Sequence, residues 1–340
     1  MSQIVTRNSS SLQINWQKEL ANVITDPKQL LLALNLDPEQ YQDHIQARQL
    51  FPMRVPRYFV ELMQTGDPND PLLRQVLPDQ AEFLTTPGFS ADPLEEQQSA
   101  IPGLLHKYQN RVLLVIRGGC AVNCRYCFRR HFPYQDNAPG SHGWQAAIDY
   151  IQAHSEINEV IFSGGDPLMA NDHQLTKLID ALAAIPHLKR LRIHSRLPVV
   201  LPYRITPQLV QLLAHCRLKT ILVTHINHPN EVSDTFKQYM APLAEAGIWL
   251  LNQSVLLKGV NDDAQILAQL SEKLSECDIH PYYLHLLDRV QGSAHFEISH
   301  ERAIAIMQAL YPLLPGFLVP RLVREEAHKT SKTPQDLGLS

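Results

Sequence analysis

The sequence contains no run of about 18 or more apolar residues, and Met1 to Leu20 lack the short apolar core of a signal peptide. We therefore expect a cytoplasmic protein with no membrane partner. Neither positive nor negative residues dominate, because 30 basic and 34 acidic residues give a net charge of -4. This balance argues against a nucleic-acid partner. With 44% hydrophobic and 19% charged residues among 340, the composition excludes a disordered or fibrous chain.

Cysteine is scarce, and its distribution does not suit a disulfide framework. The chain has five cysteines, and three of them, Cys120, Cys124 and Cys127, fall within eight residues. Cys216 and Cys277 stand alone, and we interpret them as small buried hydrophobic residues. The clustered thiols predict metal or redox chemistry.

Changes in the residue pattern along the chain predict three regions. Residues 1–105 carry short helical patterns interrupted by many prolines, which indicates an irregular helical region. Residues 106–325 alternate short apolar runs with amphipathic stretches, and residues 326–340 form a C-terminal segment. The predicted strands are Arg111–Arg117, Glu159–Ser163, Arg190–His194, Thr220–Thr224, Trp249–Leu257 and Tyr282–Leu287. The predicted helices are Trp144–His154, His173–Ala184, Pro207–Cys216, Ser233–Ala246, Asp263–Cys277 and His300–Leu310.

Six strand–helix repeats predict an α/β fold in which helices cover a parallel sheet. We expect a partial six-stranded (β/α) barrel with its site at the carboxyl ends of the strands. A doubly wound sheet remains the alternative architecture, and it would place functional residues at the same edge.

The three clustered cysteines directly follow the first predicted strand of the barrel. A structural zinc site usually needs four protein ligands, and no second cysteine pair is available, so the pattern disfavours zinc. A four-iron cluster held by three thiolates would leave one iron open to another ligand. The alternative is a chance grouping of thiols.

The C-x3-C-x2-C spacing, with Tyr126 before the last cysteine, resembles the signature of the radical SAM superfamily. That resemblance implies a 4Fe-4S cluster whose open iron binds S-adenosylmethionine.

A glycine turn at the end of the second predicted strand agrees with this interpretation. Two adjacent glycines allow a backbone to approach a ligand closely. Alone, such a turn is weak evidence. In the radical SAM superfamily the corresponding turn holds the methionyl end of the cofactor. The residues so implicated are Ser163, Gly164, Gly165 and Asp166.

From His106 to Pro334 the sequence resembles the lysine 2,3-aminomutase family, a radical SAM branch that also uses pyridoxal phosphate. The motifs that carry the resemblance are HKYQNRVLLVIRGGCAVNCRYCFRRHF (106–132), VIFSGGDPL (160–168), LRIHSRLPVVLPYRI (191–205), THINHPNE (224–231), NQSVLLKGVND (252–262) and PYYLHLLDRVQGSAHF (281–296).

The resemblance implies a role for particular residues at the pyridoxal phosphate. Lys332 matches the family lysine that forms a Schiff base with the coenzyme. Without the resemblance, it would be interpreted as a solvated tail residue. Lys107 and Arg111 match basic positions near the phosphate, although Lys107 replaces an arginine, and Tyr108 is placed to touch the ring.

The resemblance also implies the substrate contacts. Arg129 matches the arginine that holds the carboxylate of lysine, and a guanidinium suits a bidentate carboxylate contact. Asp288 and Glu325 match the two acids that hold the distant ammonium, with Glu325 in place of an aspartate. By residue type alone, Arg129 and Asp288 would be ordinary surface groups.

His225 and Gln253 match positions that line the cavity for S-adenosylmethionine and substrate. His225 and His228 could also be interpreted as a metal pair, but no acidic partner accompanies them and we favour a structural role.

The chain stops eight residues after Lys332 and has no cysteine after Cys277, which resembles the short bacterial form of the family. That form implies conversion of (S)-α-lysine into β-lysine, with the R product expected. It further implies an external electron donor and a lysyl-tRNA-synthetase-like ligase that attaches β-lysine to elongation factor P. The alternatives are an aminomutase acting on glutamate or on a protein-bound lysyl group, a sulfur-inserting radical SAM enzyme, and a metal-bearing binding module without enzymatic activity.

Overall fold

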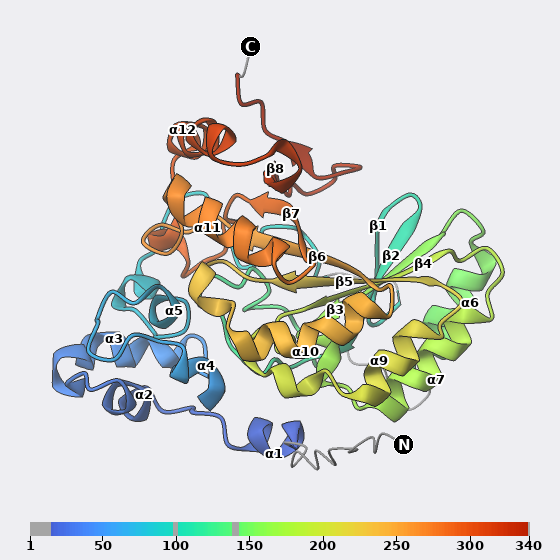
Figure 1. The fold of residues 1–340 in the computed structure, drawn as a ribbon, viewed down its shortest axis with the longest axis horizontal. Coiled ribbons are helices and arrows are strands. Elements are labelled where there is room, and N and C mark those ends of the chain that lie inside the picture. Colours follow the sequence, from blue (N-terminus) through green and yellow to red (C-terminus); the bar gives the residue numbers. More distant parts are fainter. Residues whose placement is uncertain (1–14, 98–100, 138–142, 339–340) are drawn as a thin grey trace, which may run out of the picture.

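A nine-stranded sheet forms the centre of the molecule (Figure 1). The computed structural model describes residues 15–97, 101–137 and 143–338. Every strand of the sheet pairs with the next strand in the chain, in the order β1 to β9. Strands β2 to β8 are parallel, whereas β1 and β9 add antiparallel at the two edges.

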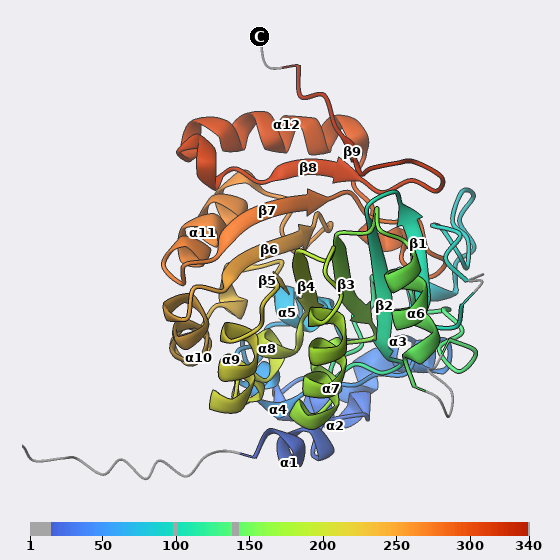
Figure 2. The ribbon, with the colours of Figure 1, turned by 90° about the vertical axis from the view of Figure 1, so that its right-hand side faces the viewer.

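This sequential order confirms the partial barrel. A doubly wound sheet reverses its strand order at a switch point, and the nine described strands contain no such reversal. Figure 2 shows the strands turning progressively from β8 to β2, so that the sheet curves while its two edges stay apart. The alternative architecture is therefore wrong.

The six predicted strands are all present, as β2 to β7, with ends within two residues of those expected. The structure adds β1 before them and β8 and β9 after them. The nine strands are β1 (Leu104–Tyr108), β2 (Arg111–Arg117), β3 (Glu159–Gly164), β4 (Arg190–Ser195), β5 (Lys219–His225), β6 (Trp249–Val255), β7 (His280–His285), β8 (Arg321–Arg324) and β9 (Thr333–Pro334).

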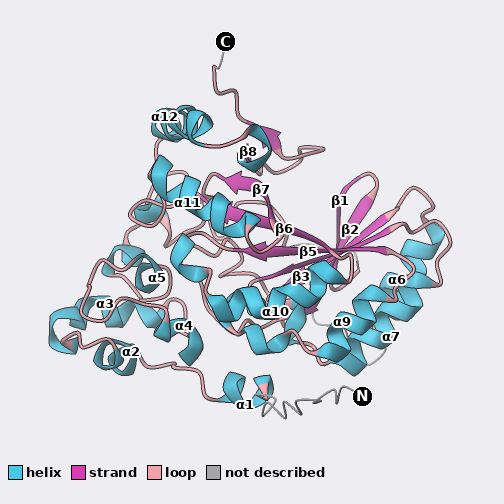
Figure 3. Ribbon diagram, in the orientation of Figure 1, coloured by secondary structure: helices cyan, strands magenta, loops and turns pink. Residues whose placement is uncertain are grey.

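The six predicted helices of the barrel are confirmed and lie along the outer face of the sheet (Figure 3). A seventh helix, α8 (Leu197–Val200), is a single turn directly after β4. The six are α6 (Gln145–Ala153), α7 (Asp172–Ala183), α9 (Pro207–Ala214), α10 (Asp234–Glu245), α11 (Ala264–Ser275) and α12 (His300–Leu310).

Strand β5 illustrates how the sheet separates the core from the barrel interior. Leu222 packs into the main core, which β5 shares with the outer helices, while Ile221 and Val223 form a small cluster with Leu251. Successive side chains of a strand point to opposite faces, so this second cluster marks the inner face. Both faces of β5 are buried, as its apolar sequence predicts.

The N-terminal helices gather at the end of the sheet toward which the parallel strands point (Figure 1). Prolines begin several of these short helices, as the sequence predicts. Asn123 and Arg125, from the cysteine loop, donate backbone hydrogen bonds to the carbonyls of Arg54 (3.0 Å) and Gln75 (2.9 Å). The N-terminal region thus supports the loop after β2. Its helices are α1 (Trp16–Ala21), α2 (Pro27–Ala33), α3 (Gln42–Gln46), α4 (Arg57–Glu61) and α5 (Pro71–Arg74).

In the part of the chain that the structure describes, no helix is both long enough and apolar enough to cross a membrane.

Candidate active site

One cavity of about 1020 Å³ lies along the inner face of the sheet. It extends from the cysteine loop at the carboxyl ends of the strands to the C-terminal segment. All sixteen site residues expected from the sequence line it: Lys107, Tyr108, Arg111, Cys120, Cys124, Cys127, Arg129, Ser163, Gly164, Gly165, Asp166, His225, Gln253, Asp288, Glu325 and Lys332.

The three cysteines lie on the loop after β2, partly buried and without disulfide bonds. Burial raises the pKa of the Cys127 thiol to about 11 and that of Cys120 well above its ordinary value. Both thiols are therefore protonated at neutral pH until a metal displaces their protons. Within the described ranges, no three His, Cys, Asp or Glu side chains converge closely enough to hold one metal ion. Three thiols on one loop beside a cavity could together hold an iron–sulfur cluster.

The glycine turn packs the end of β3 against the cysteine loop. A Cβ on Gly165 would lie 2.4 Å from the backbone oxygen of Gly119, and Gly164 has φ +109°. The Gly165 N–H donates to the carbonyl of Arg117 at 2.7 Å. These glycines are therefore needed for a close approach between two protein backbones, and their contact with a ligand stays a prediction.

Asp166 organises the next two loops from within the cavity wall. Its buried carboxylate accepts hydrogen bonds from Ser195 Oγ at 2.7 Å and from the backbone N–H groups of Leu168, Arg196 and Leu197 at 2.8–3.0 Å. Burial raises the pKa of Asp166, while these four donors oppose that rise. The side chain thus fixes the start of α8, and its contact with a cofactor stays a prediction.

Glu96 joins two of the expected ligand-binding residues, and no motif in the sequence points to it. Its Oε2 lies 2.8 Å from both Nε and Nη2 of Arg129, and its Oε1 accepts from Lys107 Nζ at 3.0 Å. Burial alone would raise the pKa of Glu96, but Arg129 and Lys107 hold it below its ordinary value. Arg129 Nη1 also donates to Ser163 Oγ at 3.0 Å. Since a guanidinium has five N–H groups, one on each terminal nitrogen stays available for a carboxylate.

Lys332 lies at the edge of the cavity, where β9 pairs with β8. It forms a short ion pair with Glu325, which also contacts Lys107 and Tyr108. Burial would raise the pKa of Glu325, but Lys332 and the other donors lower it to about 2. Arg111 stacks on the Tyr108 ring, with its Cζ 3.9 Å from the ring centroid. The C-terminal segment and the β1–β2 hairpin therefore meet at one polar cluster.

Asp288, by contrast, has no side-chain hydrogen bond to another described residue, although it faces the same cavity. Burial raises the pKa of Asp288 to about 7, against the opposing effect of Lys332. A carboxylate in this position is poised to receive a cation, because an ammonium would offset the cost of burying its charge.

His225 hydrogen-bonds Tyr126, and Gln253 lines the cavity from the neighbouring strand. His225 Nε2 lies 3.0 Å from the Tyr126 hydroxyl oxygen, and the rings stack at 5.7 Å. Burial and the nearby Arg196 lower the pKa of His225 to about 3, so the ring is neutral. His228 instead accepts a hydrogen bond from the backbone of Asn230 at 3.2 Å. The two histidines thus have separate protein partners. Cys277 is buried in the core, as predicted, whereas Cys216 packs against the core but is only partly buried.

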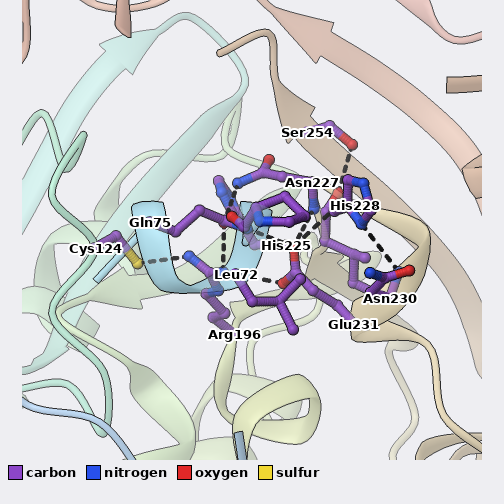
Figure 4. Close-up of polar contacts among 12 residues, drawn as sticks. Leu72, Gln75, Cys124, Arg196, His225, Asn227, His228, Asn230, Glu231 and Ser254 are labelled. Atoms are coloured by element: carbon purple, nitrogen blue, oxygen red, sulfur yellow. Dashed lines mark hydrogen bonds and ion pairs between the residues drawn. The ribbon is translucent and has the colours of Figure 1, made fainter. Parts of the chain in front are cut away.

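Arg196 is a second cavity residue that the sequence analysis missed (Figure 4). It lies directly after β4, and its guanidinium donates a hydrogen bond to the sulfur of Cys124. Arg196 lies within the family motif of residues 191–205, but its residue type does not indicate a role there. The contact joins residues 72 positions apart, and nothing in the local sequence indicates it.

Residues 114–270 match the model of the radical SAM superfamily. This segment contains all three loop cysteines, the glycine turn and strands β2 to β6, apart from the first three residues of β2. The fold and this match define a radical SAM protein.

Proteins named L-lysine 2,3-aminomutase match nearly the whole chain. The Escherichia coli (strain K12) protein is 57% identical over 340 residues, which span 100% of this chain and 99% of that protein. The Haemophilus influenzae protein is 58% identical over 94% of this chain and 95% of its own length. The Clostridium subterminale protein is 37% identical over 94% of this chain and 77% of its own. The chain belongs to the L-lysine 2,3-aminomutase family, and it is therefore an isomerase. The 4Fe-4S cluster, S-adenosylmethionine and pyridoxal phosphate are the cofactors of this family.

Proposed function

We propose that the chain converts (S)-α-lysine into β-lysine, with the R product expected. The observation that carries the proposal is the shared cavity of the cysteine loop, Lys332 and the acidic pair Asp288 and Glu325. When bound, the cluster and S-adenosylmethionine supply the radical that abstracts hydrogen, and pyridoxal phosphate carries the migrating nitrogen. The protein's own task is to hold one small substrate against these groups.

Arg129 is proposed to bind the substrate carboxylate through its two remaining N–H groups. The Glu96 carboxylate and Ser163 hydroxyl fix the plane of the guanidinium before a substrate arrives. Such preorganisation lowers the ordering cost of binding. A bidentate contact would also orient the α-carbon of the substrate.

Asp288 and Glu325 are proposed to bind the distant ammonium. Asp288 is available at once, while Glu325 is held by Lys332, Lys107 and Tyr108. An arriving ammonium would compete with Lys332 for Glu325, and engagement of the Lys332 amine by the coenzyme would release that carboxylate. Two acids disfavour glutamate at this end of the cavity, because a second carboxylate would be repelled there.

We further propose that the product serves a lysyl-tRNA-synthetase-like ligase that modifies elongation factor P in the cytoplasm. Support comes from the motif resemblance and from the higher identity to the Escherichia coli and Haemophilus influenzae proteins, 57% and 58%, than to the clostridial one, 37%. An external one-electron donor reduces the cluster. The test is the mass of elongation factor P isolated from cells with and without this chain. An unchanged mass would contradict this role.

The principal test is an anaerobic assay with iron, sulfide, pyridoxal phosphate, S-adenosylmethionine, a reductant and L-lysine. We expect chromatography on a chiral phase to show β-lysine of the R configuration. Cys124→Ala should abolish both product and cleavage of S-adenosylmethionine. Lys332→Ala should abolish product and the visible coenzyme band that borohydride removes, while it retains the cluster. Cleavage without β-lysine would contradict the proposal and direct the search to a protein-bound lysyl group and then to glutamate.

A further inference from the structure

The guanidinium of Arg196 lies directly against one of the three loop cysteines. Its Nη1 donates to Cys124 Sγ at 2.8 Å, and the side chain is only 6% exposed (Figure 4). Cys120 and Cys127 receive no such hydrogen bond from a side chain in the described part of the molecule. The three thiols are therefore not equivalent: the buried Arg129 lies near Cys120 and Cys127, but only Cys124, among the described residues, accepts a hydrogen bond from a guanidinium.

The position of Arg196 is fixed from both sides. Asp166 accepts from its backbone N–H at 2.8 Å and so anchors the start of α8. On the far side of the guanidinium, Nη2 donates to Gln75 Oε1 at 2.7 Å and to Glu231 Oε2 at 3.0 Å. Gln75 and Glu231 also hydrogen-bond each other, which leaves the guanidinium little freedom to turn.

The other groups around Cys124 carry no compensating negative charge. Tyr126 and His225, which hydrogen-bond each other beside Cys124, are not acidic residues. Glu231, the one acid paired with Arg196 among the described residues, contacts Nη2 and not the Nη1 that reaches sulfur. The positive end of this ion pair thus faces the cysteine.

Arg196 also has one unused donor. Nη1 serves Cys124 and Tyr126, and Nη2 serves Gln75 and Glu231. Nε is buried and finds no acceptor among the residues that the structure describes. An unpaired buried N–H costs about 1–3 kcal/mol, so a further acceptor at this wall of the cavity would be stabilising.

We propose that Arg196 is a positioning residue of the cluster, which orients Cys124 and raises the reduction potential of the bound 4Fe-4S centre. Hydrogen bonds to ligating sulfur and nearby charge both set the potential of such clusters. When an external donor adds one electron, the cluster gains one negative charge. A cation and an N–H donor beside the sulfur stabilise this reduced form more than the oxidised form. The inference depends on the cluster and not on the substrate, so it survives a failure of the proposed lysine reaction.

The alternative is that Arg196 merely ties the N-terminal region to the barrel through Gln75 and Glu231. Three substitutions separate the two roles: Arg196→Lys keeps the charge, Arg196→Gln keeps a neutral donor, and Arg196→Met keeps neither. Arg204 provides the matched control, because it is equally buried and paired with Asp172 at 2.8 Å. Its Nε and Nη2 donate to the carbonyls of Leu168 and Ala170, and it contacts no cysteine.

The measurement is the midpoint potential of the reconstituted cluster, followed by electron paramagnetic resonance in a redox titration without substrate. We expect more negative potentials for Arg196→Gln and Arg196→Met, the largest shift for Met, and partial recovery in Arg196→Lys. Arg204→Gln should keep the wild-type potential. Equal potentials in all variants that retain iron would overturn the proposal.

A second readout covers the case in which the Met variant loses its cluster. Electron–nuclear double resonance of the reduced wild-type cluster should detect an exchangeable proton coupled to it through the N–H···S bond. That signal should disappear in D₂O and in whichever Arg196 variant retains iron without a donor at this position. A wild-type spectrum with no exchangeable coupling, together with unshifted Lys and Gln variants, would leave Arg196 with the structural role alone.

Discussion

The charged side chains in this cavity differ in whether another side chain of the protein already forms an ion pair with them. Glu96, Glu325 and Arg129 all have ion-pair partners, whereas the carboxylate of Asp288 has none among the described residues. The sequence could point to Asp288 and Glu325 as a pair only through their family positions. It could not reveal that Glu325 is already paired in the free chain. Its partner Lys332 reaches it only because β9 folds back onto β8, and its partner Lys107 comes from a distant strand.

The unsatisfied Asp288 predicts how lysine binding depends on pH. Its pKa is about 7 in the free chain, and a bound ammonium would favour the charged form and lower that pKa. The KM for lysine should therefore rise as pH falls below about 7, by up to roughly tenfold per pH unit. Asp288→Asn should raise the KM and remove this dependence. Glu325, with a pKa near 2, and His285, with a pKa well below its ordinary value, do not titrate in this range. The test is to measure the KM for lysine from about pH 6 to 8 in wild type and in Asp288→Asn. If the KM of the variant depends on pH as steeply as that of wild type, Asp288 is not the group that binds the ammonium.

Two adjacent acids allow a second test at the level of residues. Glu96 is buried against Arg129 and Lys107, whereas the neighbouring Glu95 is exposed and, among the described residues, has an ion pair only with His328. Glu96→Gln should lower the free energy of unfolding by about 1–3 kcal/mol and raise the KM for lysine. Glu95→Gln should change stability by no more than about 1 kcal/mol. Urea denaturation measures the free energy of unfolding of both variants, and a lysine assay measures their KM. Equal changes in the two variants would mean that Glu96 does not position Arg129.

At the level of elements, the sequence predicted β2 to β7 because their apolar runs are long and bounded by helices. Strands β8 and β9 could not be predicted, because they have four and two residues, which is too few to show the two-residue alternation of a strand. Strand β1 carries polar His106 and Lys107, and it exists because β2 offers it an edge to pair with. These three short strands bring Lys107, Tyr108 and Lys332 to the cavity.

The contact between the glycine turn and the cysteine loop predicts contrasting effects of two alanine substitutions. Gly165→Ala would push a Cβ to 2.4 Å from the Gly119 oxygen, whereas a Cβ at Gly119 meets nothing within 4 Å. We expect Gly165→Ala to cost about 1–3 kcal/mol and to lower the iron content after reconstitution. Gly119→Ala should retain wild-type iron content. Iron and sulfide analysis provides the measurement. Equal loss in both variants would show that the turn does not support the loop.

For the whole molecule, the sheet order explains why so much of the site could be predicted. Parallel strands paired in sequence bring every carboxyl end to one edge, so that residues after consecutive strands meet in space. The network of Gln75, Arg196 and Glu231 could not be predicted, because it joins the N-terminal region to two strand ends with no repeating spacing.

Side chains of β1 contact the C-terminal segment across the cavity, and this link predicts a global effect of the coenzyme. Pyridoxal phosphate that binds only the folded protein should stabilise it by about 2.7 kcal/mol at 100 times its dissociation constant. The melting temperature of wild type should therefore rise with pyridoxal phosphate, while Lys332→Ala should gain much less. Inorganic phosphate serves as the control ligand. An equal rise for both proteins would place the stabilising contact away from Lys332.

The distance along the chain between the cysteine loop and Lys332 has a consequence for biosynthesis. Cys127 and Lys332 are 205 residues apart, which corresponds to about 10–40 s of translation. Strand β2 and its thiols thus leave the ribosome long before β8 and β9 can close the far edge of the cavity. Assembly of the enzyme has a built-in order, in which a nascent chain presents three reactive thiols before the coenzyme lysine has been synthesised. The loop thiols are thus exposed to oxidation during synthesis before the residue that would hold the coenzyme exists.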